Sequence, residues 1–147
     1  MTEITGTVAA VKAVTDAEAD TGNAINLDTD FTAVVSDTGS VAASDLTSVS
    51  LKTTGNITAT GVTTITGTAS QIATLIGDEA DSGNGVNLAA NVAATVTGTA
   101  AAADLTTINN GTTGLVTATG VTTITGTAAA VKAVIDAEAD TGNAINL

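Results

Sequence analysis

Apolar residues recur along this chain in two alternating patterns. In one, Val, Ile and Leu stand three or four residues apart within an Ala-rich segment, as in Val8, Val11 and Val14. That spacing places the apolar side chains on one stripe of a short helix. In the other, apolar and polar residues alternate, which is typical of a half-buried strand. The chain therefore predicts short helices that alternate with strands.

Five pairs of alternating apolar residues are predicted to form strands. Each pair follows a polar turn that contains Gly, which favours the exit from a helix. The first residue of each pair lies 18 or 19 residues beyond a Gly-Thr or Gly-Ser dipeptide, so each unit should place its strand at the same phase. A second extended leg follows the first four pairs, over 31–35, 62–65, 92–96 and 121–124. The pairs are Ile25/Leu27, Ile57/Ala59, Val86/Leu88, Val116/Ala118 and Ile145/Leu147.

One stretch occurs three times, at residues 2–27, 63–88 and 122–147, and the first and last copies agree at 23 of 26 positions. A fixed period of this size is typical of repeat architectures. The predicted fold class is a β-solenoid with short helices (an α/β repeat solenoid) of about five coils of roughly 30 residues, with equivalent parallel strands stacked along the axis. Two coils make each repeat of about 60 residues, and 1–147 is predicted to be a single domain with repeats at approximately 2–62, 63–121 and a partial 122–147.

Composition narrows the class of protein. Apolar residues make up 44% of the chain, but Phe31 is the only aromatic residue, and Pro, Cys, His, Trp and Tyr are absent. We therefore expect a thin core of small and branched side chains. The net charge of −12 makes nucleic-acid binding improbable, because phosphate neutralisation needs Lys and Arg. No apolar run is long enough for a membrane helix, and the first residues do not read as a signal peptide, so no membrane insertion is expected.

Catalysis is not expected. Without His, Cys or Arg, the chain can build neither a Ser-His-Asp nor a Cys-His arrangement, nor a His- or Cys-ligated metal site. No phosphate-binding glycine loop of the Walker type occurs. We therefore predict that the protein is not an enzyme and has no catalytic or cofactor-binding residues.

Three acidic clusters are the candidate metal sites. Carboxylates at short intervals suit hard cations such as Ca²⁺, so calcium is the one possible cofactor. The spacing of the acidic residues does not match the EF-hand pattern. The same residue types are also common in turns and on solvated surfaces, so the metal-site and the structural interpretation both stay open. The candidate ligands are Asp16, Glu18, Asp20, Asp78, Glu79, Asp81, Asp136, Glu138 and Asp140.

A family resemblance is carried by two phrases, GTAAAADLTTI at 98–108 and VTTITGTA at 121–128. They resemble repeats of large secreted or cell-surface bacterial proteins of the RTX (hemolysin-associated) kind, rich in Thr, Ala and Gly. The resemblance implies an extracellular or cell-surface location and a structural or adhesive role. The RTX nonapeptide G-G-x-G-x-D does not occur in this chain, so calcium binding is not carried over from that family.

The functional prediction is a non-enzymatic structural repeat segment, with a calcium-binding or adhesive module as the alternative. A third alternative, ice binding, rests on the Thr-x-Thr spacing of Thr58/Thr60 and Thr117/Thr119. The partner is expected to be the protein itself, as a homo-oligomer or filament formed through the terminal coils. This follows because unpaired terminal strands are templates for pairing with another chain.

Overall fold

The computed structural model describes residues 2–18, 25–79, 85–138 and 144–147. Short strands and helices alternate along them, as the apolar patterns predict. The helices are α1 (Val8–Glu18), α2 (Ala43–Ser50), α3 (Ala69–Glu79), α4 (Ala102–Gly111) and α5 (Ala128–Glu138). The strands are β1 (Glu3–Gly6), β2 (Thr32–Val35), β3 (Ser40–Ala42), β4 (Ile57–Thr58), β5 (Thr64–Thr68), β6 (Val86–Asn87), β7 (Ala93–Ala101), β8 (Val116–Thr125) and β9 (Ile145–Asn146).

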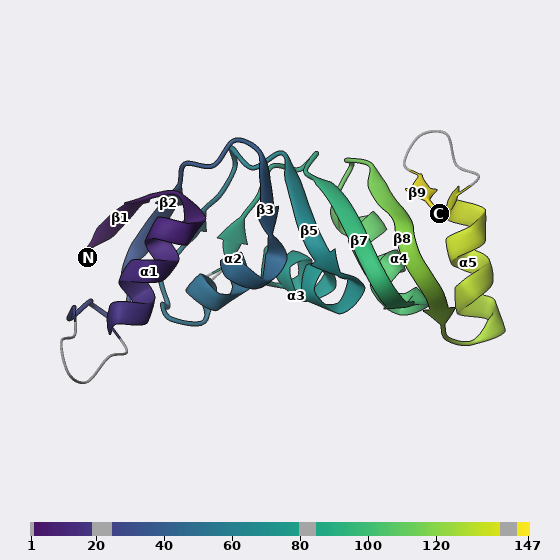
Figure 1. The fold of residues 1–147 in the computed structure, drawn as a ribbon, viewed down its shortest axis with the longest axis horizontal. Coiled ribbons are helices and arrows are strands. Elements are labelled where there is room, and N and C mark those ends of the chain that lie inside the picture. The colour runs from purple at the N-terminus through teal and green to yellow at the C-terminus, as the bar shows by residue number, and fades with distance from the viewer. Residues whose placement is uncertain (1, 19–24, 80–84, 139–143) are drawn as a thin grey trace.

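The strands form two sheets in which every pairing is parallel. One sheet has the order β1-β2-β4-β6, and the other has the order β3-β5-β7-β8-β9. Parallel neighbours need a crossover connection, and helices supply most of these crossovers. Figure 1 shows α1 and the N-terminus at one end of the long axis, and α5 and the C-terminus at the other. The two termini are therefore separated by the length of the molecule.

The predicted fold class, a β-solenoid with one stack of equivalent strands, is wrong. The structure is a small α/β domain with two parallel sheets. The expected strand at Ile25/Leu27 is not a strand, and the other four pairs divide between the sheets. Extended legs also pair with them, since Ala33 is in register with Ile57 and Ala94 with Val116. The constant spacing shows where each segment lies within its repeat. It does not determine which strands are joined by hydrogen bonds.

The roles that followed from that architecture lose their basis with it. A location at a bacterial surface and assembly into a filament are predictions for a repeat solenoid. They depend on equivalent coils that stack in one column. With the strands divided between two parallel sheets, the structure gives no support to an extracellular or filament-forming role.

The core consists mainly of small and branched aliphatic side chains, as composition predicts, and runs from Val8 to Ile145. Its members are almost all Val, Ile, Leu and Ala, drawn from both sheets and all five helices described. Phe31 is also buried, with 1% of its surface exposed. Branched aliphatic side chains fill this space because the helices lie close to the sheets.

Two Thr-Thr-Gly turns connect the shorter helices to the strands that follow. After α2, the buried Thr53 hydroxyl donates to the Phe31 carbonyl and accepts from the Gly55 amide. After α4, Thr112 makes the same pair of bonds, to the Val92 carbonyl and from the Gly114 amide. Each turn thus holds a neighbouring extended leg by a side-chain bond where no strand ladder reaches. A Cβ at either glycine would collide with the carbonyl of that leg, so glycine is required there.

Burial of one repeated isoleucine depends on how many neighbours its strand has. Ile65 on β5 is 0% exposed, and β5 pairs with β3 on one side and β7 on the other. The equivalent Ile4 on β1 and Ile124 on β8 are only partly buried. Among the described residues, β1 pairs with β2 alone, and the part of β8 that contains Ile124 pairs with β7 alone. Two flanking strands are therefore needed to bury this position.

We expect Ile65→Ala to lower the free energy of unfolding by about 2–5 kcal/mol, because it leaves a cavity in a close-packed core. Ile4→Ala and Ile124→Ala remove side chains that are already partly in water, so each should cost less, about 1–2 kcal/mol. Urea unfolding at low protein concentration measures all three. Equal losses at the three positions would contradict the dependence of burial on flanking strands.

Candidate functional site

The acidic residues predicted as metal ligands lie at the C-terminal ends of α1, α3 and α5. Asp16 and Glu18 end α1, Asp78 and Glu79 end α3, and Asp136 and Glu138 end α5. The three pairs belong to different helices, and within the described residues no three acidic side chains form a group that could hold a metal ion. Three further candidates, Asp20, Asp81 and Asp140, lie outside the described residues.

Three of these carboxylates already have partners in the protein. The Lys12 ammonium lies 2.7 Å from Asp16, and the Lys132 ammonium lies 2.6 Å from Asp136, each one helical turn apart. The hydrogen bond that the Lys12 ammonium donates to the Asp16 carboxylate raises the pKa of Lys12 above its ordinary value. Exposed pairs of this kind contribute little to stability. These ion pairs direct the carboxylates of Asp16 and Asp136 toward lysine. Calcium binding by the acidic clusters stays a prediction.

Asp78 has a different role. Its carboxylate accepts a 2.6 Å hydrogen bond from the hydroxyl of Ser50, which is 7% exposed at the end of α2. A bond from a hydroxyl to a carboxylate is stronger than one between neutral groups. Asp78 therefore joins α3 to α2 and acts in helix packing.

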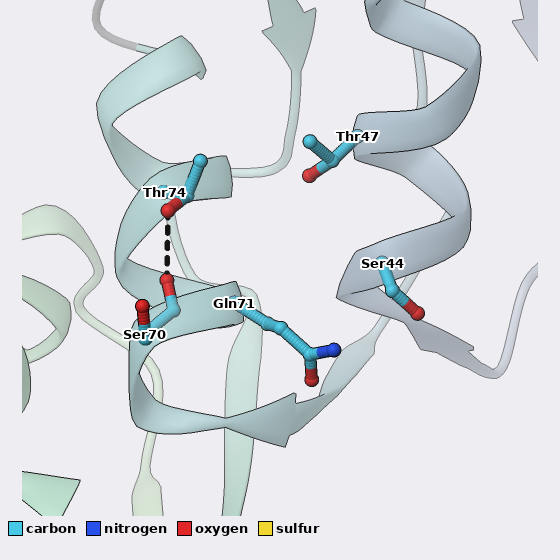
Figure 2. Close-up of a pocket in the computed structure, with 5 residues that line it drawn as sticks. All are labelled: Ser44, Thr47, Ser70, Gln71 and Thr74. Carbon is cyan, nitrogen blue, oxygen red and sulfur yellow. Dashed lines mark hydrogen bonds between the residues drawn. The ribbon is translucent and has the colours of Figure 1, made fainter.

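A small cavity of about 250 Å³ lies between α2 and α3 and is lined by polar side chains. Figure 2 shows the lining residues in two facing groups, one from each helix. The lining residues are Ser44, Thr47, Ser70, Gln71 and Thr74.

Several polar groups in this cavity are already used. The Thr74 hydroxyl donates to the Ser70 carbonyl, and the Gln71 side-chain oxygen accepts from the Thr68 amide at the start of α3. The Thr47 hydroxyl oxygen is buried and has no hydrogen-bond partner. The lining has no carboxylate, amine or other base, so it can donate and accept hydrogen bonds but cannot move a proton. Its chemistry is that of a small neutral pocket.

Sequence reasoning missed this pocket, although the repeat contains the signal. The middle copy has Ser70, Gln71 and Thr74 where the first copy has three alanines, Ala9, Ala10 and Ala13. The last copy also has alanine at all three positions. The divergence of the middle copy is therefore concentrated in part on one helix face, which the structure places against α2.

The threonines considered for ice binding do not form one ladder. Thr58 is in register with Val34 and Asn87, and Thr117 is in register with Thr95 and Asn146. The two Thr-x-Thr segments also belong to different sheets. A continuous threonine surface is therefore not built from these two segments.

Strand order bears on ligand binding as well. Open parallel α/β sheets bind ligands where the strand order reverses, at a crevice beyond the carboxyl ends of the strands. In both sheets described, the strand number rises steadily from one edge to the other. These strands therefore provide no reversal point, and the usual nucleotide crevice of α/β domains is not formed by them.

The exposed faces of the two end helices form the most distinctive surface. Three equivalent positions are buried in α1 and α3 but not in α5: Val11 and Thr15 are buried in α1, as are Ile72 and Ile76 in α3. Their α5 equivalents are less buried: Val131 is partly buried, and Ile135 is 52% exposed. The third position shows the same pattern, with Val8 and Ala69 buried and Ala128 exposed.

The opposite face shows the reverse pattern. Leu75 in α3 and Val134 in α5 are 0% exposed, and each of these helices has a preceding helix packed beside it. The equivalent Val14 in α1, which has no preceding helix, is only partly buried. We call Ile4, Ala10, Ala13 and Val14 the N-terminal face. We call Ile124, Val131 and Ile135 the C-terminal face.

Comparison of the chain with protein-family models, with curated proteins and with solved structures found no match. The resemblance to RTX-associated repeats stays a prediction. Among the residues that the structure describes, none of the helices is long and apolar enough to span a membrane.

The unpartnered hydroxyl of Thr47 can be tested against its equivalent in the next repeat. Thr106 occupies the same position in α4, where its hydroxyl donates a 3.0 Å bond to the Ala102 carbonyl. We expect Thr47→Val to be neutral or stabilising by up to about 1 kcal/mol, because it removes a buried unsatisfied oxygen. Thr106→Val should instead cost about 0.5–1.5 kcal/mol.

Chemical denaturation of the two variants beside the parent chain measures the difference. If Thr47→Val is destabilised as much as Thr106→Val, the Thr47 hydroxyl has a partner in solution, and the pocket is hydrated.

Proposed function

We propose that this chain is a non-enzymatic structural module that associates with further copies of itself. The single observation that carries the proposal is the state of its two ends. Ile65 and Leu75 are fully buried in the middle of the molecule, whereas the equivalents of Ile65, Ile4 and Ile124, and the α1 equivalent of Leu75, Val14, are only partly buried.

Strand edges support the same proposal. Among the described strands, β1 has one partner, β2, so its other edge has main-chain groups with no strand beside it. The Gly120–Thr125 part of β8 is likewise paired only with β7. Such edges are templates for pairing with another chain. An added strand would also cover Ile4 or Ile124.

The charge of the chain sets the conditions for this association. A net charge of −12 repels a second copy, and the repulsion weakens as salt shortens the screening length. The apolar contribution to the contact does not depend on that screening. Association should therefore be weak at low ionic strength and stronger at high ionic strength.

We expect the average mass of the isolated chain to rise above that of a monomer as its concentration rises from about 1 µM to about 500 µM, which spans dissociation constants from tight to weak association. The rise should be larger in about 0.5 M salt than in about 0.05 M salt, because salt screens the repulsion between acidic copies. Sedimentation equilibrium or light scattering measures the mass.

A constant monomer mass over this whole range, at both salt concentrations, would contradict the proposed function. A second series with millimolar calcium, compared with chelator, separates cation-dependent association from the apolar contact proposed here.

A further inference from the structure

We propose that the pocket between α2 and α3 is a binding site for a small neutral polyol, a molecule that carries several hydroxyl groups and no charge. The lining comes from two neighbouring helices, which face each other across the cavity in Figure 2. The pocket shares no residue with the N-terminal face or the C-terminal face, so binding there is separate from the association proposed above.

Polar side chains are concentrated at this one contact between helices. The contact between α4 and α5 is its counterpart in the next repeat, and there alanine stands at four of the five lining positions. The four residues are Ser44, Ser70, Gln71 and Thr74, and their counterparts are Ala103, Ala129, Ala130 and Ala133. Alanine therefore satisfies the packing of such a contact, and packing alone does not account for the polar side chains between α2 and α3.

The fifth lining residue, Thr47, directs its hydroxyl into the pocket. Its counterpart Thr106 donates a 3.0 Å hydrogen bond to the Ala102 carbonyl, one turn earlier in its own helix. The Thr47 hydroxyl oxygen is buried, has no hydrogen-bond partner in the described structure, and points toward α3 in Figure 2. A buried hydroxyl with no partner costs free energy. This hydroxyl is therefore available to donate to a bound molecule and to accept from it.

Gln71 supplies further donors from the opposite helix. Its side-chain oxygen accepts a 3.0 Å bond from the Thr68 amide, and its main-chain amide donates to the Thr68 hydroxyl, which together form a capping box. Because the oxygen is held in this way, the side-chain nitrogen is turned toward α2, as Figure 2 shows. The two N–H groups on that nitrogen bond to no described residue, so they remain available to a ligand that accepts hydrogen bonds.

Size and charge determine which class of molecule fits. A volume of about 250 Å³ is the space of about eight water molecules at roughly 30 Å³ each, so the ligand is small. The lining has no charged group, and a bound ion would lose its hydration without gaining a counter-charge. Hydroxyl and amide groups instead pair with groups that both donate and accept, as the hydroxyls of a polyol do. With so few hydrogen bonds, we expect a dissociation constant of about 1–10 mM.

An amide-detected NMR titration of the full chain tests the site, with glycerol and xylitol as probes from about 1 mM to about 100 mM. The side-chain amide of Gln71 and the main-chain amides of 44–47 should shift and saturate. The amides of the α4–α5 contact should change only in proportion to the added polyol, because polyols affect all protein surfaces weakly. 1-Propanol, which has the three-carbon chain of glycerol and a single hydroxyl, is the control ligand.

Two variants of α3 remove the polar groups without disrupting the helix. The triple variant S70A/Q71A/T74A gives α3 the alanines of α1 and α5. Both of those helices keep a threonine cap beside alanine, since the Ala130 amide donates to the Thr127 hydroxyl and α1 has the same bond. Gln71→Glu is the finer change, because a carboxylate still accepts the bond from the Thr68 amide but has no N–H to donate. Circular dichroism verifies that each variant is folded.

Both variants should bind glycerol and xylitol at least about tenfold more weakly than the parent chain, so that no saturation is reached at about 100 mM. Thr106→Val, at the counterpart contact, is the control variant and should bind as the parent does. A parent chain with no saturable shift would overturn the proposal. Equal binding of glycerol and 1-propanol would overturn it as well, because the site would then not recognise multiple hydroxyls. Unchanged binding by the triple variant or by Gln71→Glu would place the polyol elsewhere.

Discussion

Parallel pairing of short strands is the constraint on which the rest of this structure depends. Parallel neighbours cannot be joined by a tight turn, so the chain must cross over between them, and most crossovers here are the helices. A helix and two-residue strands such as β4 and β6 bury too little by themselves to be stable. Each unit therefore depends on its neighbours for burial, and the interior units bury most of their branched side chains.

The residue types follow from that dependence. Val, Ile, Leu and Ala fill most of the core, and Phe31, the one aromatic residue of the chain, is buried as well. Threonine is used in two ways, in the strands and at turns such as Thr53 and Thr112, whose hydroxyls bond a neighbouring main chain. These bonds fix the extended legs where the ladders are interrupted. The same hydroxyl chemistry, when left unpaired at Thr47, produces the polar cavity between α2 and α3.

The sequence was sufficient to predict the alternation of helices and strands, the parallel pairing and the thin aliphatic core. It was insufficient for the fold class, because the near-identity of residues 2–27 and 122–147 shows only that they have the same local structure. The segments that pack beside each copy decide which strand edges pair. The sequence of the copy itself does not identify those segments. The polar cavity was missed for a related reason: Gln71 and Thr74 come to face Ser44 and Thr47 only when two helices are packed together.

Repetition also makes it possible to compare the burial of equivalent positions at the two ends and in the interior. Inside the chain, α3 meets α4, and Gly111 lets Ile76 approach the helix backbone. Like-charged copies also repel each other, whereas units of one chain are held together by covalent bonds. A contact between copies should therefore bind less tightly than the contacts within one chain, so we expect association that is reversible and depends on concentration and salt.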